Sequence, residues 1–518
     1  MNTNYNLSIK HYLILFLVFI PTVYILTGAY AGLNGHHSWR QADVYGHILG
    51  FMDFKNFEPF DRFNCSKGIF DIPIYQWLIA NLAKLFTKDP LVITSIVDYI
   101  LWGITATSGY FISESIGKKY SGVVFLFLIS TSPLILHYYS VLLPDTMSIA
   151  FSLLAILVMQ YVGTTYKSLI LVMPFLTIAT LIKSPIPFVF IAFYSIYLFL
   201  NNSFYSKKGA VTFLKKYSPF LVILISLVLL AISAELLRTA LLGSFNGAKF
   251  AQNPIWYFGT WELRTSLKFW GTIYKRFSDF MPYNFFLIYF VVSIIILFLK
   301  PNRQLINISI ASLGTFLIGW LTFSNVYYVH DYYQLPVAII IFISFAVSMS
   351  FVMDYVQGEK TINIKHQKLI GVFTLLLITT FVVINNKYIS DRHRISFSDS
   401  LEYFLRNQNT ILFAGEQLQP DDPTFAGKIS TKTKNTTIKD LDANCEQFLQ
   451  QYEAILVDDY SKCLDKYKLY AEVWVQDSSK TFFILDPFRG QKTPIFKNSH
   501  VQQKTQNIDL LTLTPDTL

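Results

Sequence analysis

The chain has 518 residues, of which 53% are hydrophobic and only 14% are charged. Soluble domains average about 25% charged residues, so this composition excludes an ordinary soluble protein and indicates an integral membrane protein. The net charge of +9 does not indicate nucleic-acid binding, because the basic residues cluster in short loops between apolar runs.

Apolar runs of about 20 residues recur, and each is long enough to cross a hydrocarbon core roughly 30 Å thick. They are rich in Leu, Ile and Phe and favour helices, since the strands of a membrane barrel would be short and alternating. The first span is expected to stay as an anchor, because no cleavage motif follows it. We expect about eleven transmembrane helices, at residues 12–31, 94–113, 121–137, 144–161, 168–183, 185–200, 218–241, 284–299, 305–323, 335–353 and 369–386.

Lysine and arginine residues set the expected topology. They occur in alternate loops, for example at Lys118-Lys119, Lys207-Lys208 and Lys300 with Arg303, and Lys10 precedes the first span. Placing the N-terminus in the cytoplasm puts all of these loops inside, as the positive-inside rule requires. The long loops 32–93 and 242–283 are then outside, and we expect amphipathic helices in both.

The loop 32–93 begins with polar residues directly after the first span. Ser38 is a plausible N-cap for a helix over 39–54. Two alternatives fit such a helix equally well: its polar face lies toward a cavity, or it lies in solvent. Three polar residues share that face because they are spaced i, i+3 and i+7: Arg40, Asp43 and His47.

Other polar residues occur at the outer ends of later spans. Asp145 follows Pro144 and is either a helix cap or a site residue. Lys183 either extends harmlessly to the interface or holds a lipid phosphate. The run His330-Asp331-Tyr332-Tyr333 is either a polar loop tip or a place where two aromatic rings pack on a sugar. Ionisable residues beside a bilayer are functional candidates by default.

Residues 387–518 are polar, with short apolar runs that predict buried strands at 410–413, 454–457 and 482–485. Cys445 and Cys463 are 18 residues apart and are either a disulfide or two free thiols. The predicted fold class is a polytopic α-helical membrane protein with about eleven transmembrane helices and a small C-terminal α/β extracytoplasmic domain. The expected domains are residues 1–386 and 387–518.

Five short motifs occur along the chain: the stretch from His36 to Asp43, Pro73-Ile74-Tyr75, Pro144-Asp145, Lys183 with Pro185, and His330 to Tyr333. Together they resemble the C-type (GT-C) glycosyltransferase superfamily, family 39. The branch is the one related to protein O-mannosyltransferases and to the lipid A aminoarabinose transferase, and many of its members are bacterial. The chain departs from it in having Val44 after Asp43 and Asp71 where the aminoarabinose transferase has a lysine.

The resemblance implies an enzyme of a bacterial inner membrane that uses a polyprenyl-phosphate sugar outside the cytoplasm by an inverting displacement. Asp43 is the expected catalytic base. The expected partners of the donor phosphate are Arg40 and Lys183 first, then Arg264 and Lys268. Residues expected to position the acceptor or the sugar are His36, His37, His47, Asp145, His330, Asp331, Tyr332 and Tyr333. No cofactor is expected, and a divalent metal held by some of these His and Asp residues is the alternative.

Several alternatives stay open at this point. The acceptor is a protein, lipid A or a cell-surface glycan. A transporter or flippase of a lipid-linked or polar solute is the main rival, although transporters tend to place ionisable residues near the bilayer midplane. Most charges here lie at outer span ends, with Asp98, Glu235 and Arg238 as exceptions. A non-enzymatic scaffold is a third interpretation.

Overall fold

The chain divides into two compact units, which are described separately: residues 1–30 with 69–389, and residues 31–68 with 390–518. The computed structural model describes residues 9–28, 38–53, 72–163, 166–203, 218, 222–223, 225–230, 232–233, 254–280, 303–358, 410–414, 432–436, 438–451, 454–457, 469–475, 480–485, 494–495 and 511–512.

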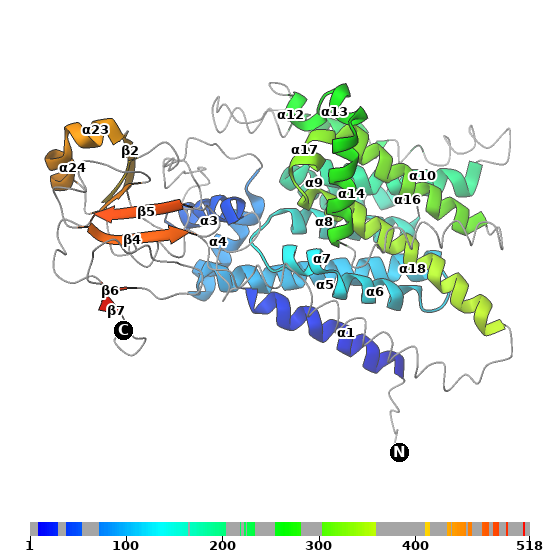
Figure 1. Cartoon of the computed structure of the whole chain (residues 1–518). Coiled ribbons are helices and arrows are strands. Elements are labelled where there is room, and N and C mark those ends of the chain that lie inside the picture. Colours follow the sequence, from blue (N-terminus) through cyan, green and yellow to red (C-terminus); the bar gives the residue numbers. More distant parts are fainter. Residues whose placement is uncertain are drawn as a thin grey trace, which may run out of the picture. The chain divides into compact units, whose positions relative to one another are not determined.

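The described part of the first unit is helical (Figure 1). Its elements are α1 (Ile9–Leu26), α4 (Ile74–Phe86), α5 (Pro90–Ile116), α6 (Ser121–Thr131), α7 (Pro133–Tyr138), α8 (Asp145–Val162), α9 (Tyr166–Lys183), α10 (Pro185–Ser203), α12 (Pro254–Phe258), α13 (Trp261–Thr265), α14 (Leu267–Phe280), α16 (Arg303–Thr322), α17 (Ser324–Val329), the 3-10 turn η2 (Tyr332–Gln334) and α18 (Leu335–Gly358).

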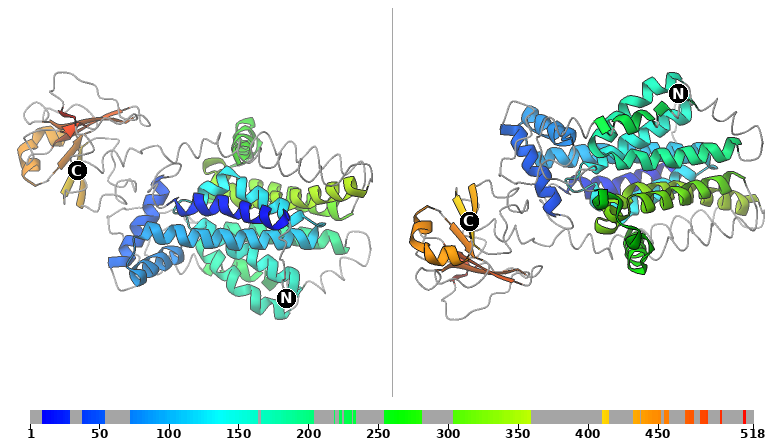
Figure 2. Two further views of the ribbon diagram at one scale, coloured as in Figure 1. Left: turned by 90° about the horizontal axis from the view of Figure 1, so that it is seen from below. Right: turned by 90° about the horizontal axis from the view of Figure 1, so that it is seen from above.

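The long helices of this unit pack side by side as a bundle, and the two views of Figure 2 show that they share a common direction. Helix α8 contacts α5, α9 and α10, while α6 contacts α1, α5 and α18. Close approach of α5 and α6 depends on Gly109, because a Cβ there would lie 2.2 Å from the ring of Phe125, which is fully buried. Helix α14 instead runs across the direction of the bundle (Figure 1).

Four helical segments among the described residues are long and apolar enough to cross a membrane: Pro90–Ile116, Asp145–Val162, Arg303–Thr322 and Tyr332–Phe351. The expected spans up to residue 200, and those at 305–323 and 335–353, fall on helices of the structure. The expected spans 284–299 and 369–386 lie outside the described residues, and 218–241 lies largely outside them.

One expected span is interrupted. Residues 121–137 were expected as one helix, but α6 ends at Thr131 and α7 begins at Pro133. Proline has no N–H to continue the helical ladder, and its ring disfavours helical geometry in the residue before it. Ser132 accordingly has φ −67° and ψ 117°. A second proline, Pro185, separates α9 from α10, where the sequence predicts two closely spaced spans.

The ends of α5 and α8 follow ordinary capping rules. Asp89 is the N-cap of α5, and its carboxylate accepts a 2.7 Å hydrogen bond from the N–H of Leu91. Pro90 occupies the first helical position, where its missing N–H costs nothing. Helix α8 ends at Gly163, whose φ of +83° is readily adopted by glycine.

The described part of the second unit contains helix α3 (Ser38–Asp53), helices α23 (Ile438–Ala443) and α24 (Cys445–Gln451), and strands. Five strands form one sheet in the order β2-β1-β3-β5-β4, and β6 (Pro494–Ile495) pairs with β7 (Leu511–Thr512). Strand β1 is parallel to β2 and β3, whereas β5 is antiparallel to β3 and β4. The strand bounds are β1 (Thr410–Ala414), β2 (Lys432–Thr436), β3 (Ala454–Val457), β4 (Leu469–Val475) and β5 (Lys480–Leu485).

The three apolar runs that predict strands form β1, β3 and β5. The runs of β1 and β3 pair in parallel, which suits them because parallel strands are usually covered on both faces and so are apolar throughout. Cys445, at the start of α24, is buried and disulfide-bonded. Cys463, which the sequence offers as its partner, lies outside the described residues.

Candidate functional site

Three of the polar motifs lie at the same end of the bundle. Asp145 begins α8 and Lys183 ends α9. These two helix ends are adjacent, because the Ser148 hydroxyl lies 2.9 Å from the Ala179 carbonyl oxygen and 3.4 Å from that of Lys183. The Lys183 Nζ atom also lies 5.3 Å from the centre of the Tyr333 ring, which joins the end of α9 to the start of α18. We call this end, with Asp145, Lys183 and residues 330–333, the motif end.

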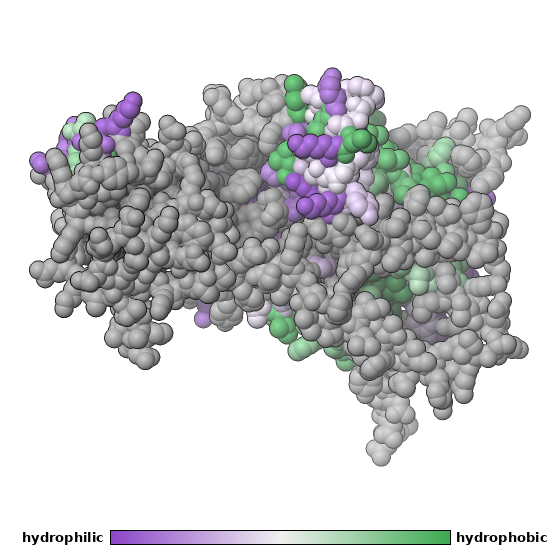
Figure 3. Space-filling model, viewed as in Figure 1, coloured by the Kyte–Doolittle hydropathy of each residue, from purple (hydrophilic) through white to green (hydrophobic). Residues whose placement is uncertain are grey.

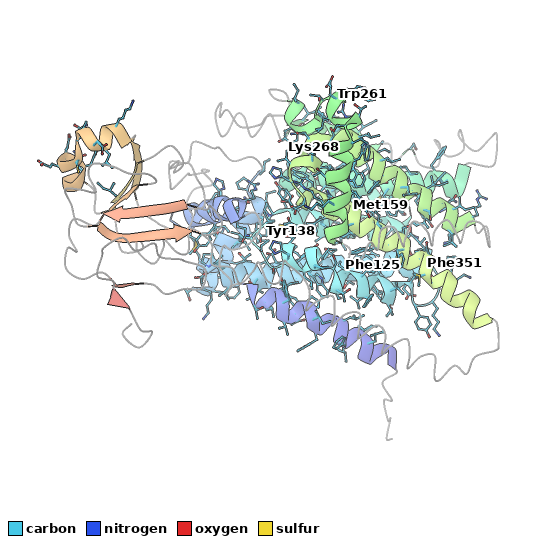
Figure 4. The ribbon with its side chains drawn as sticks, in the orientation of Figure 1. Phe125, Tyr138, Met159, Trp261, Lys268 and Phe351 are labelled. Carbon is cyan, nitrogen blue, oxygen red and sulfur yellow. The ribbon has the colours of Figure 1, made fainter. Side chains whose placement is uncertain are left out.

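Basic residues gather at the opposite end of the same bundle. The Arg303 guanidinium donates a 3.2 Å hydrogen bond to the Asn201 carbonyl, at the far ends of α16 and α10. The backbone N–H of Lys118 donates to the Ser350 hydroxyl at 3.0 Å, between the α5–α6 turn and the far part of α18. Figure 4 shows the resulting separation, with Tyr138 and Phe351 labelled toward opposite ends. The bundle therefore separates its basic loops from its motif end.

The run from His330 to Tyr333 is an aromatic cluster. The His330 and Tyr332 rings stack with centroids 5.1 Å apart, and the Tyr332 and Tyr333 rings stack with centroids 4.9 Å apart. The two tyrosines are only 4% and 6% exposed, whereas His330 is partly exposed. The rings that the sequence offers for a sugar thus pack first on one another, with the imidazole toward the surface. Their contact with a sugar stays a prediction.

Tyr138 also belongs to this end, although the sequence motifs do not include it. Its hydroxyl donates a 2.5 Å hydrogen bond to the Asp331 carboxylate, although the two residues are 193 positions apart. Its ring also lies edge-on to Tyr332 and to His137. Both Tyr138 and His137 are fully buried. One feature of the sequence could have identified Tyr138. The run His137-Tyr138-Tyr139, at the end of an expected span, is similar in composition to the later His-Asp-Tyr-Tyr run.

Ionisable side chains are concentrated at the motif end in nearly buried positions. Asp145 is 1% exposed, Asp331 5% and Lys183 7%. A charge removed from water is costly unless it is paired or hydrogen-bonded, so such groups persist where the structure or the function needs them. The ammonium over the Tyr333 ring gains a cation–π attraction that strengthens on desolvation. This end can therefore hold a cation and two carboxylates in fixed positions.

Three of the residues expected from the first outer loop lie on α3 of the second unit, namely Arg40, Asp43 and His47. Helix α3 covers the predicted segment and begins at Ser38. Arg40 and His47 are 4% and 8% exposed, so these two side chains are not on a solvated face. Asp43 lies within α3, but its side chain is outside the described residues, as are His36 and His37. Their expected roles stay predictions.

The segment α12–α14 is shaped by a tight turn. Gly259 has φ +68° and a Cβ there would lie 2.5 Å from the Ser324 hydroxyl, so both the conformation and the space require glycine. The Thr260 side chain caps α13 by accepting from the N–H of Leu263 at 3.2 Å. The backbone N–H of Glu262, and then the Thr260 hydroxyl, lower the pKa of the Glu262 carboxyl.

Two cations of this segment were expected at the donor phosphate. The Arg264 guanidinium donates to the Leu321 carbonyl at 2.7 Å and to the Phe258 carbonyl at 2.6 Å, which ties α13 to α12 and to the end of α16. Two of its three nitrogens therefore have a structural role. Lys268 is exposed on α14 (Figure 4), where hydrophilic and hydrophobic residues are mixed on the surface (Figure 3). Phosphate binding by either residue stays a prediction.

Among the described side chains, no group of three or more His, Cys, Asp or Glu residues is arranged to hold a metal ion. The described side chains do not include those of His36, His37 and Asp43, which the sequence offers as ligands. Metal independence therefore stays an expectation.

No protein-family model and no curated protein sequence matches the chain. Solved structures do match. ArnT from Cupriavidus metallidurans bound to undecaprenyl phosphate aligns with a TM-score of 0.59 at 10% identity, over 92% of this chain and 98% of ArnT. ArnT in the apo state gives a TM-score of 0.54 at 9% identity, with the same coverage. The apo oligosaccharyltransferase of Archaeoglobus fulgidus gives 0.50 at 11% identity, over 91% and 74% of the two chains.

Both matched proteins are C-type glycosyltransferases, the lipid A aminoarabinose transferase and an oligosaccharyltransferase. The similarity covers nearly the whole chain at low identity, so it establishes the fold. The C-type fold predicted from the sequence motifs is confirmed.

Proposed function

We propose that this protein is an inverting membrane glycosyltransferase that moves a sugar from a polyprenyl-phosphate donor to an acceptor outside the cytoplasm. The observation that carries the proposal is a C-type glycosyltransferase fold with one lysine and two carboxylates buried together at the motif end. A glycosyl transfer from a lipid phosphate needs such groups, since negative charge develops on the phosphate and a proton must leave the acceptor.

Lys183 is the proposed partner of the donor phosphate in the first unit. Its ammonium is held near the Tyr333 ring at the motif end, and an ammonium is a compact charge well suited to a phosphate. ArnT, which shares the fold, was solved with undecaprenyl phosphate bound, and this supports a donor of the same class here. Arg40 is the second proposed partner, and Arg264 and Lys268 follow.

The proposed reaction is a single displacement. The acceptor oxygen forms a bond to the anomeric carbon while the bond from that carbon to the phosphate oxygen breaks, which inverts the anomeric configuration. Polyprenyl phosphate leaves with the bonding electron pair, and the acceptor proton passes to the Asp43 carboxylate. Asp145 and Asp331 position the sugar or the acceptor, together with His36, His37, His47, His330 and the tyrosines 332 and 333. The displacement involves no net oxidation or reduction, so the step requires no redox cofactor.

The proposal includes the topology. We place the N-terminus in the cytoplasm of a bacterium, about eleven spans in the inner membrane within residues 1–386, and residues 387–518 outside as an α/β domain. Two observations support this placement. The bundle end with Lys118 and Arg303 is basic, as cytoplasmic ends are. Cys445 is disulfide-bonded, and disulfides persist mainly in oxidising compartments outside the cytoplasm.

The test is a transfer reaction with purified protein in lipid nanodiscs. A panel of undecaprenyl-phosphate sugars is supplied with candidate acceptors (a hydroxyl-bearing peptide, lipid A and a surface glycan), and release of undecaprenyl phosphate is measured. Asp43→Asn should fold normally and transfer no sugar. Asp89→Asn is the matched control, because asparagine also caps a helix and Asp89 lies on the surface.

Two outcomes would contradict the proposal. Turnover of Asp43→Asn at the wild-type rate would remove Asp43 as the base. Movement of the intact lipid-linked sugar across the bilayer without release of undecaprenyl phosphate would instead indicate a transporter or flippase. Mass spectrometry of surface glycans from cells with and without the protein then identifies the acceptor.

A further inference from the structure

Asp98 is a fully buried carboxylate on the transmembrane helix α5. The Tyr75 hydroxyl lies 3.0 Å and 3.1 Å from its two oxygens and donates to them. The Thr146 hydroxyl lies 3.2 Å from Oδ1. All three side chains have no exposed surface. A carboxyl group in an apolar span is retained only at a cost, so its partners indicate what it is for.

The two partners come from different elements. Tyr75 lies in the first turn of α4, and Thr146 lies in the first turn of α8. Thr146 is the residue after Asp145, which we place at the substrate. The Thr146 hydroxyl also lies 2.9 Å from the Leu143 carbonyl, so the same group holds the turn that leads into α8. Asp98 therefore joins three helices at the position where the chain delivers Asp145.

We propose that Asp98 is a positioning residue that fixes Asp145 at the motif end by holding the starts of α4 and α8 together. The proposal rests on the proposed function for its effect on catalysis. Asp98 acts through Thr146, and no reacting group needs to touch it. Small errors in placing a substrate-positioning group have large effects, since a shift of about 1 Å can cost on the order of a hundredfold in rate.

The structure offers near-isosteric changes that separate positioning from chemistry. Tyr75→Phe and Thr146→Val each delete one hydroxyl and leave the packing volume nearly unchanged. Asp98→Asn keeps an oxygen for the Tyr75 hydroxyl and offers N–H to the Thr146 oxygen, while the Thr146 proton goes to the Leu143 carbonyl. The Asn variant thus keeps a hydrogen bond to each of the two partners and lacks the charge. A carboxylate that takes a proton or binds a cation would be inactivated by the same change.

The matched control is Ser312→Ala. The Ser312 hydroxyl is fully buried and bonds the Ser344 hydroxyl at 3.2 Å, between α16 and α18. The variant removes one interhelical hydrogen bond of the same kind from a part of the bundle that we do not assign to the reaction. It should lower the melting temperature about as much as Thr146→Val and leave kcat unchanged.

The experiment measures kcat, KM for the undecaprenyl-phosphate sugar and the melting temperature in nanodiscs. We expect Thr146→Val and Asp98→Ala to lower kcat by about tenfold or more, at a temperature where both are folded, with KM for the donor within about twofold of wild type. Asp98→Asn should restore kcat to within about threefold. Wild-type kcat in Asp98→Ala would overturn the proposal, and so would an Asn variant as slow as the Ala variant.

Failure of the proposed function is distinguishable from failure of this inference. If wild-type protein transfers no sugar from any donor, the proposed function falls, and the melting temperatures still test the junction. In that case Tyr75→Phe with Thr146→Val should destabilise more than the two single changes added together, because the buried carboxyl loses both donors at once. Strictly additive losses would show that Asp98 does not couple α4 to α8.

Discussion

The hydrogen bond between Tyr138 and Asp331 gives the sharpest quantitative test of the motif end. Tyr138→Phe removes only the hydroxyl that donates to the Asp331 carboxylate at 2.5 Å. A hydrogen bond to a charged group contributes about 1.5–3 kcal/mol, and here the acceptor is 5% exposed, so water does not replace the lost donor. We expect the free energy of unfolding to fall by that amount and sugar transfer to fall with it.

The neighbouring tyrosine is a matched control. Tyr139 is also fully buried, but its hydroxyl pairs with the neutral Thr105 hydroxyl at 2.7 Å. Tyr139→Phe should therefore cost only about 0.5–1.5 kcal/mol and leave transfer near the wild-type rate. Unfolding by denaturant in detergent measures both variants, and adding Asp331→Asn to Tyr138→Phe completes a double-mutant cycle. An equal or larger loss for Tyr139→Phe, or a cycle with no coupling, would refute the reasoning.

Three further predictions concern a lysine, a glycine and a cysteine. Lys183→Met should weaken binding of undecaprenyl phosphate by roughly tenfold to a hundredfold, measured by titration in nanodiscs, whereas Lys118→Met, which removes a similar lysine 5.4 Å from the Phe351 ring at the other end, should not. Gly109→Ala should lower the melting temperature through a steric cost of about 1–3 kcal/mol, whereas Gly103→Ala, where a Cβ meets nothing within 4 Å, should not; equal shifts would contradict this. Cys445→Ser should lower the free energy of unfolding of the second unit by about 2–4 kcal/mol, measured by denaturant unfolding. If the variant is also less stable than wild type whose disulfide has been reduced, the missing disulfide is not the cause of the loss.

The sequence was sufficient for the helices because their signal is local. Long apolar runs and prolines at 133 and 185 set where the helices end, and among the expected spans that lie on described residues the break at Ser132 is the one that was not predicted. That break matters, because it makes a separate short helix, α7, from which Tyr138 reaches Asp331 and Tyr139 reaches Thr105. A continuous helix is expected from hydropathy, because one proline hardly changes the mean hydropathy of a span. The same proline, Pro133, forces Ser132 out of the helical conformation and so ends the helix.

The site was harder to predict because its contacts are not local. Lys183, Asp145 and the His330–Tyr333 run were chosen as span-end residues, and the structure brings them to one end of the bundle. In the sequence Asp98 is only an exception to the charges at outer span ends, and its partners emerge from the packing of three helices. Arg264 illustrates the same difficulty, since two of its nitrogens donate to backbone carbonyls that are far away in the sequence or on a neighbouring helix, while its expected role at the phosphate stays a prediction. Sequence spacing does not reveal which acceptor a guanidinium finds.

Helix α5 has 27 residues, which corresponds to about 40 Å of length against a hydrocarbon layer of roughly 30 Å. Hiding the whole helix in that layer would require a tilt near the upper limit of about 40° seen for membrane helices. The helix is therefore long enough to reach the depth of the lipid headgroups, and Asp98 lies roughly two turns from its first residue. A long isoprenoid carrier keeps its phosphate at this same depth, so its sugar can be reached while the chain remains dissolved in the bilayer.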